Sequence, residues 1–120
     1  MGIRKYSKSE LVSLPLNEWG RGKALGDAPP SVITGKRLDV TLGSVDSWGI
    51  WEASPGTFVR EVQAAEYMHI LAGECTFTPE SGTEMAISAG DCLFFPPNTR
   101  GVWRIIAPLR KVYALFQSQE

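Results

Sequence analysis

The residues of this chain that could carry out chemistry are carboxylates spaced along one segment. Glu52, Glu61, Glu66 and Asp91 all lie within residues 51–95. Carboxylate oxygens can bind a metal ion, and in a dry pocket they can exchange protons with a substrate. Desolvation beside an indole should raise the pKa of a carboxyl group, which would suit Glu66 to general acid–base work. Glu66 is therefore the candidate catalytic residue. The plainer alternative is that Glu66 is only a buried strand residue held by hydrogen bonds.

Cysteine and histidine add little chemistry. Cys75 and Cys92 both lie in apolar, strand-like runs without a CxxC motif, which predicts two buried free thiols. The single histidine, His69, is three residues from Glu66, and alternation along a strand places the two on opposite faces. We therefore expect His69 to be a structural or interface residue.

Short runs rich in β-branched and aromatic residues alternate with glycine and proline from residue 37 onward. This punctuation predicts short strands joined by tight turns. The predicted strands cover residues 37–42, 47–53, 101–106 and 110–117, with a three-stranded meander between residues 56 and 95. The predicted turns fall at residues 71–74, 79–82, 90–91 and 107–108. Eight or so strands without a long helix predict an all-β sandwich or barrel.

Alternation along these strands groups the polar candidates with aromatic residues. Residues 101, 103 and 105 share one face of their strand, as do residues 111, 113 and 115. Arg60 and Glu61 cannot both face inward unless a bulge intervenes, and the register stays open. An apolar pocket with a few converging polar groups is the usual small-ligand site. The candidate ligand-binding residues are Glu61, Trp103, Tyr113, Lys111, Phe95 and Arg60, while Trp48, Trp51 and Phe58 are expected in the core or a dimer interface.

Two phrases of the sequence resemble the two motifs of the cupins: EYMHILAGE, and GDCLFFPPN further along. Glu66 and Gly73 match the first motif, and Gly90 and Pro96 match the second. The flanking segments are similar to small single-domain cupins grouped with the ethanolamine-utilisation Q protein and, distantly, with ureidoglycine aminohydrolase. The resemblance implies an RmlC-like double-stranded β-helix, a jelly-roll barrel. It also implies that Glu66 faces the interior and that Tyr113 and Lys111 lie near the cavity.

The chain departs from the cupin pattern at every metal-binding histidine. These positions fall on Val59 and Glu61 or on Arg60 and Val62, according to the spacing, and on Gly101. A divalent transition metal, if one were bound, would have only Glu61 and Glu66 as ligands, so no cofactor is predicted. The absence of these histidines also disfavours ureidoglycine aminohydrolase activity.

Length and composition are those of one ordinary domain. The 120 residues are 43% hydrophobic and 21% charged, with a net charge of −1. No apolar run approaches the ~20 residues of a membrane span, and residues 1–10 do not resemble a signal peptide. Residues 1–40 carry a net charge of +3 and residues 41–120 a net charge of −4. This asymmetry is too weak to indicate nucleic-acid binding. We expect a soluble, cytoplasmic protein with neither a membrane nor a nucleic acid as partner.

Residues 1–36 are predicted to form an N-terminal arm, and residues 37–120 the single cupin domain. A helical turn is expected near residues 9–14, with Ser9 as its cap. The arm carries several leucines and Trp19, so it should pack on the barrel or on a second subunit. Because exposed strand edges are usually covered in natural proteins, we expect a homodimer.

Two classes of function remain open. In the first, the cupin binds a small polar metabolite in its barrel, with metal-independent acid–base chemistry at Glu66. In the second, it is a non-catalytic small-molecule sensor or an accessory subunit. A metal-dependent enzyme is the least favoured option. The resemblance suggests ethanolamine or ureide catabolism as contexts without assigning either.

Overall fold

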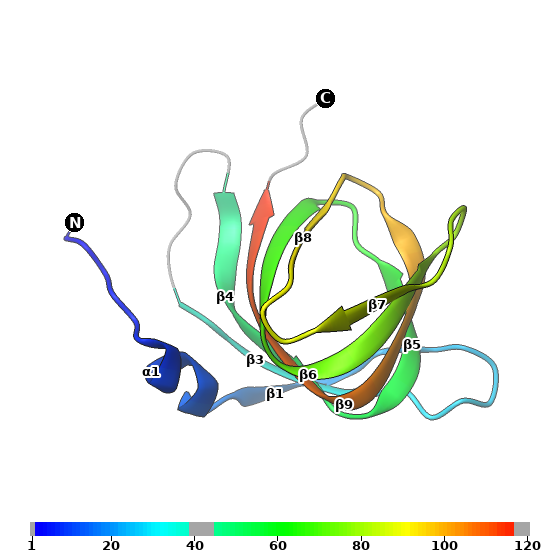
Figure 1. Cartoon of the computed structure of the whole chain (residues 1–120), viewed down its shortest axis with the longest axis horizontal. Helices are drawn as coiled ribbons and strands as arrows, with labels where there is room; N and C mark the ends of the chain where they lie inside the picture. The colour runs from blue at the N-terminus through cyan, green and yellow to red at the C-terminus, as the bar shows by residue number, and fades with distance from the viewer. Residues whose placement is uncertain (1, 39–44, 117–120) are drawn as a thin grey trace.

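The computed structural model describes residues 2–38 and 45–116, which form one short helix and nine strands (Figure 1). The elements in chain order are α1 (Lys8–Ser13), β1 (Asn17–Arg21), β2 (Lys23–Ala24), β3 (Val32–Arg37), β4 (Val45–Ala53), β5 (Gly56–Glu61), β6 (Ala65–Pro79), β7 (Met85–Ser88), β8 (Cys92–Phe95) and β9 (Arg100–Phe116). Within these described ranges, no helix is long and apolar enough to cross a membrane. Part of the strand predicted at residues 37–42 lies outside the described residues.

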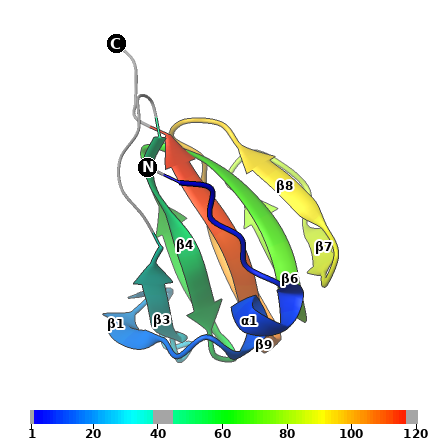
Figure 2. The same ribbon diagram turned by 90° about the vertical axis from the view of Figure 1, so that its left-hand side faces the viewer.

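Two long strands organise the sheet. β9 pairs antiparallel with β4, β5 and β6, and β6 pairs in turn with β7 and β8. β3, β1 and the short β2 extend the sheet at its margins. Figures 1 and 2 show the strands curling around a common interior. The predicted all-β barrel is therefore confirmed.

A shared bend in β6 and β9 replaces two of the predicted turns. The turns predicted at residues 71–74 and 107–108 are wrong, because β6 and β9 run without interruption through both segments. The β6–β9 pairing shifts register between Ile70 and Cys75, as expected of β-bulges, which bend a strand. Gly73 lies in this bend at φ +99°, and a Cβ atom there would meet the Pro108 carbonyl oxygen at 2.1 Å. The sequence marks the bend with glycine and proline, the same residues that mark turns.

The barrel interior is an aromatic core. Its fully buried residues include Phe77, Met68, Ile70, Trp103 and Leu109. The ring of Phe77 packs against those of Phe95 and Trp103, each with a centroid separation of 4.8 Å. The predicted alternation on β6 is confirmed, since residues 66, 68 and 70 are buried whereas Tyr67 is exposed.

The helix covers a second, smaller core on the outer face of the barrel. Leucines of α1 and of the segment after it, together with Trp48, pack against the buried Leu38, Ile50 and Leu71. Ser7 caps the helix in a capping box with Glu10, so the cap predicted at Ser9 is wrong by two residues. The rest of residues 1–36 contributes β1, β2 and most of β3 to the sheet. The boundary at residue 36 and the homodimer stay predictions.

Substituting Gly73 by alanine should destabilise the fold more than substituting Gly90. Both glycines have a positive φ, +99° and +96°, but only Gly73 has backbone atoms where a Cβ would lie. Gly90→Ala should cost about 1 kcal/mol, the penalty for the left-handed backbone. Gly73→Ala should cost more than about 2 kcal/mol, because the backbone must also shift. Urea unfolding measures both, and equal losses would show that the contact with Pro108 is unimportant.

Candidate functional site

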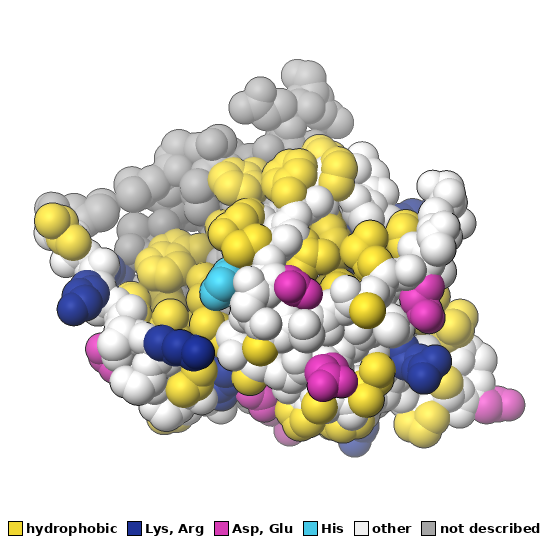
Figure 3. All heavy atoms as spheres, viewed as in Figure 1, with side chains coloured by type: hydrophobic (Ala, Val, Ile, Leu, Met, Phe, Trp, Pro, Cys, Tyr) yellow, Lys and Arg dark blue, Asp and Glu magenta, His cyan; other side chains and the backbone are white. Residues whose placement is uncertain are grey.

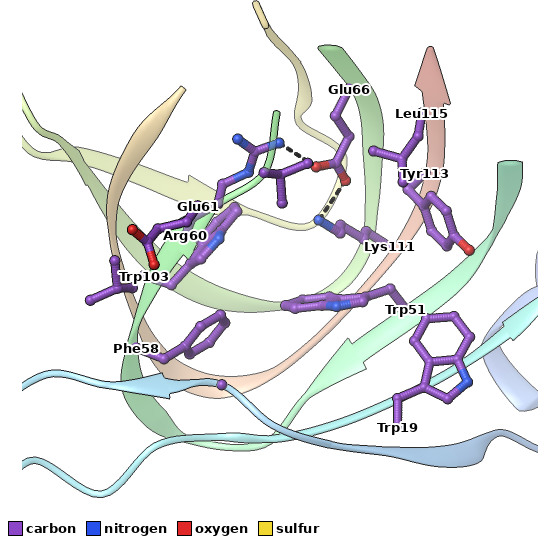
Figure 4. A pocket seen from close by; sticks show the side chains of 13 residues that line it. Trp19, Trp51, Phe58, Arg60, Glu61, Glu66, Trp103, Lys111, Tyr113 and Leu115 are labelled. Atoms are coloured by element: carbon purple, nitrogen blue, oxygen red, sulfur yellow. Dashed lines mark hydrogen bonds and ion pairs between the residues drawn. The ribbon is translucent and has the colours of Figure 1, made fainter. Parts of the chain in front are cut away.

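The barrel contains a pocket of about 330 Å³ (Figure 4). Its wall is predominantly aromatic and aliphatic, with four charged side chains, two positive and two negative. The lining residues are Trp19, Gly22, Trp51, Phe58, Val59, Arg60, Glu61, Val62, Glu66, Trp103, Lys111, Tyr113 and Leu115. The volume is that of a site for a small metabolite.

A buried cluster of three charges lies in this pocket. Arg60 Nη2 donates to Glu66 Oε1, and Lys111 Nζ donates to Glu66 Oε2, both at 2.8 Å. None of the three side chains is more than 6% exposed. The residues come from β5, β6 and β9, and Figure 4 shows the carboxylate between the two cations. Arg60 also donates from Nη1 to the carbonyl oxygen of Thr99 at 2.7 Å.

Aromatic rings lie against both cations. Lys111 Nζ is 4.2 Å from the ring centroid of Trp51 and 5.3 Å from that of Trp103. The guanidinium of Arg60 lies 4.7 Å from the centroid of Phe95. Such cation–π contacts stabilise a desolvated cation that water no longer reaches. Trp51 and Lys111 are direct cross-strand partners in the β4–β9 register, so the sheet itself sets their contact.

The cluster shifts the pKa values of its members. Burial raises the pKa of Glu66, but the charges and hydrogen bonds of Lys111 and Arg60 outweigh burial, and the pKa ends below its ordinary value. The expectation of a raised pKa is therefore wrong. The sequence indicated Arg60 and Lys111 as pocket candidates, but not that both contact Glu66. Burial lowers the pKa of Lys111, and the adjacent Glu66 opposes this effect only in part.

The structure answers which of Arg60 and Glu61 faces inward. Arg60 points into the barrel, whereas Glu61 lies at the pocket rim and is 35% exposed. Glu61 accepts hydrogen bonds there from Lys23 and, at 2.6 Å, from Arg100. Arg100 in turn lies 3.8 Å from Glu80. Glu61 and Glu66, the two potential metal ligands, are thus held by different pairs of cations.

The remaining predicted site residues divide between the wall and its support. Trp103 and Tyr113 line the pocket. Phe95 lies beneath Arg60 and is absent from the lining, so it supports the site from behind. Burial raises the pKa of the Tyr113 hydroxyl. The ring of Tyr113 packs edge-on against Trp19, with a centroid separation of 6.5 Å.

Sequence reasoning missed three aromatic residues of the wall. Phe58 belongs to the barrel core and Trp51 packs against it, as expected, but both also line the pocket. Trp19, which was assigned to the arm, lines the pocket too. Alternation along residues 47–53 separates Trp51 from Trp48, but it does not say which of the two faces inward. Trp19 lies on β1, and nothing in the sequence indicates that this segment reaches the pocket.

The pocket residues do not fit a divalent metal ion. Cupins hold their metals through converging histidines and carboxylates, but across the described ranges no three His, Cys, Asp or Glu side chains converge. Both oxygens of Glu66 already accept hydrogen bonds from cations. At Gly101, the position of the third motif histidine, a Cβ would meet Thr78 O at 2.4 Å and the Phe77 ring at 2.5 Å. Phe77 thus fills the space that a ligand side chain would need.

His69 lies on the face of β6 opposite Glu66, away from the charge cluster, and Figure 3 shows the histidine side chain in cyan at the molecular surface. Its Nδ1 atom is 3.2 Å from Cys92 Sγ, and the Tyr67 hydroxyl donates to the same sulfur at 3.4 Å. Cys92 is exposed, so the prediction of a buried thiol is wrong for this residue; β8 turns that side chain to the outer surface. Cys75 is buried as predicted, and burial raises the pKa of its thiol to about 11.

Solved structures with this fold include several cupins. EutQ of Clostridium difficile is 18% identical, with a TM-score of 0.72 over 92% of this chain and 86% of its own. A putative ethanolamine utilization protein Q of Salmonella typhimurium is 22% identical, with a TM-score of 0.62 over 73% of this chain and 72% of its own. A DUF861 family protein of Thermotoga maritima is 36% identical over 57% of this chain and 78% of its own, with a TM-score of 0.55.

Curated protein sequences include no match to this chain. The sequence pattern of the EutQ-like cupin domain, in contrast, matches residues 40–113, more than half of the chain. This range includes all of the long strand β6 and most of β9. It also includes the three charged residues of the cluster. The chain therefore belongs to the family of EutQ-like cupin domains.

Proposed function

We propose that the barrel pocket binds a small organic anion, a carboxylate held by Arg60 and Lys111. The observation that carries this proposal is that two buried cations share one buried carboxylate. A buried charge is costly unless it is paired, and Glu66 can neutralise only one of the two. An anionic ligand would supply the second negative charge. Glu61 at the pocket rim does not cancel the excess positive charge of Arg60 and Lys111, because it is itself paired with both Lys23 and Arg100.

The rest of the pocket suits the carbon part of such a ligand. Trp51, Trp103 and Phe58 provide apolar and aromatic surface beside the charged cluster. Apolar walls with a few converging polar groups are typical of metabolite sites. The volume of about 330 Å³ limits the ligand to a small molecule.

A cationic amine fits this site poorly. The faces of Trp51 and Trp103, where an ammonium group would bind, already carry the Lys111 ammonium. Ethanolamine, which appears in the name of the Salmonella relative, is a cation at neutral pH and would meet like charge there. The pocket therefore favours an acid over an amine as its ligand.

In this proposal Glu66 begins as a proton acceptor and not as a proton donor. Its pKa lies below the ordinary value, so at neutral pH the group is a carboxylate with no proton to give. It holds the two cations in position and can accept a proton from Lys111, to which it is hydrogen-bonded. The proposed binding of a carboxylate needs no metal ion.

Small carboxylates should raise the melting temperature, because a ligand that binds only the folded state stabilises it. We expect propionate to do so, and propionamide and ethanolamine to have little effect, since neither carries negative charge. Arg60→Met and Lys111→Met each leave Glu66 with one cation and should abolish the propionate effect. Arg104→Gln, on the outside of the barrel, is the control and should retain it. A similar shift with propionamide, or no shift with propionate, would contradict the proposal.

Removing the Glu66 carboxylate should destabilise the protein far more than removing that of Glu61. Each bridges two cations, but the Glu66 cluster is buried and the Glu61 cluster is exposed. Glu66→Gln leaves two buried cations without a counter-charge and should cost about 3–5 kcal/mol. Glu61→Gln should change the stability little, because solvent-exposed ion pairs contribute little to it. Urea unfolding at pH 7 measures both, and equal losses would refute the assignment.

The difference between wild type and Glu66→Gln should also depend on pH. The folded-state pKa of Glu66 lies below its ordinary value of 4.5. The stabilisation from its carboxylate is therefore complete above that value and is lost as the pH falls through the folded-state pKa. Unfolding curves should show the two proteins converging in stability at low pH. A constant difference down to the acid unfolding limit would show that Glu66 does not titrate as inferred.

A further inference from the structure

We propose that Lys111 is a nucleophile that forms a Schiff base with the carbonyl group of a small oxo acid. The inference rests on the proposed binding of a carboxylate and narrows its substrate class to carboxylates that carry an adjacent aldehyde or ketone. Arg60 would hold the carboxylate of such a ligand, and the Nζ atom of Lys111 would meet its carbonyl carbon.

The position of Lys111 suits a nucleophilic amine. It is the only lysine among the described residues that line the pocket, and its side chain is 4% exposed. Around Nζ lie the rings of Trp51 and Trp103 and, at 3.7 Å, the sulfur of Met68. Burial away from water favours the uncharged amine, which is the nucleophilic form. It lowers the pKa of this group against the opposing effects of Glu66 and of the two cation–π contacts.

A proton acceptor for the ammonium group is already in contact. Glu66 Oε2 lies 2.8 Å from Nζ, so it can take the proton that Lys111 must lose before attack. The Nζ lone pair then forms a bond to the carbonyl carbon, and the carbonyl oxygen becomes a hydroxyl by taking the proton back from Glu66. Loss of that hydroxyl with one further amine proton, as water, leaves a protonated imine. Ammonium and carbonyl thus give iminium and water, with no oxidant or reductant.

The placement of Arg60 selects the substrate class. Arg60 and Lys111 contact the two different oxygens of one carboxylate, so their charged ends lie close together in the same pocket. In a 2-oxo acid, the carboxylate and the carbonyl are on adjacent carbons. One small molecule can therefore reach the guanidinium with its carboxylate and the amine with its carbonyl. The resulting iminium would withdraw electrons from the neighbouring bonds of the substrate, as in other Schiff-base enzymes.

Trapping with pyruvate tests the inference. The full chain is incubated with pyruvate and sodium borohydride, which reduces an imine to a stable amine, and modified lysines are located by peptide mass spectrometry. We expect one adduct per chain, on Lys111, enriched several-fold over Lys23, whose side chain is 64% exposed. Acetone, which has the carbonyl but no carboxylate, should give little adduct, and excess propionate should compete with pyruvate.

Two variants complete the design. Lys111→Arg keeps the positive charge beside Glu66 but cannot form an imine, so it should lose the adduct while it still folds. Lys23→Arg should retain the adduct on Lys111. Melting temperatures measured with pyruvate and propionate on the same samples separate the two proposals. If both acids raise the melting temperature but no adduct forms, or if adducts spread evenly over exposed lysines, the Schiff base is refuted and anion binding stands. If neither acid shifts the melting temperature and no adduct forms, both proposals fail.

Discussion

The Glu66 carboxylate, shared between two buried cations, is the interaction on which the rest of the site depends. Three strands each contribute one charge: β5 and β6 follow one another in the sequence, whereas Lys111 of β9 lies 45 residues beyond Glu66. Because an unpaired charge in this interior would be costly, β5, β6 and β9 must keep their registers for the cluster to exist. The aromatic rings under the cations reinforce this requirement. Fold and site are therefore specified by the same contacts.

Other members of the cupin family can hold a metal ion through histidines at the place in the barrel where this charge cluster lies. Here the charges differ in sign, since a guanidinium and an ammonium lie beside the one remaining carboxylate. Phe77 fills the space above Gly101 that the third metal-binding histidine would occupy. Under the proposal above, these residues would offer a ligand fixed positive charge without a bound metal ion. Both organic cations can donate hydrogen bonds, and Lys111 can also act as a nucleophile once it loses a proton.

Alternation along strands predicted much of the site, because it needs only the sequence. It grouped residues 101, 103 and 105 on one face and residues 111, 113 and 115 on another, and the resemblance to cupins directed Glu66, Lys111 and Tyr113 toward the interior. Glu66, Trp103, Lys111 and Tyr113 all line the pocket. Sequence patterns failed where they have two meanings. The same glycine and proline that punctuate turns here bend continuous strands, and a cysteine in an apolar run proved exposed because β8 is short and lies at the outside. The pKa of Glu66 could not be foreseen, since it depends on cations brought near by long-range pairing.

Neighbouring cations on β9 face opposite sides of the barrel wall. Lys111 lies in the pocket, whereas Arg110 lies outside it, where its guanidinium donates to Glu52 at 2.8 Å and to the backbone oxygens of Leu11 at 2.8 Å and Leu14 at 3.3 Å. These carbonyls belong to the last turn of α1 and its C-cap, so Arg110 fastens the helix to the strand that carries the pocket lysine. The pocket lysine and the residue that holds the outer helix are therefore neighbours in the chain, on opposite faces of β9. A spectroscopic reporter attached to α1 would show whether a ligand bound beside Lys111 changes the contacts of Arg110.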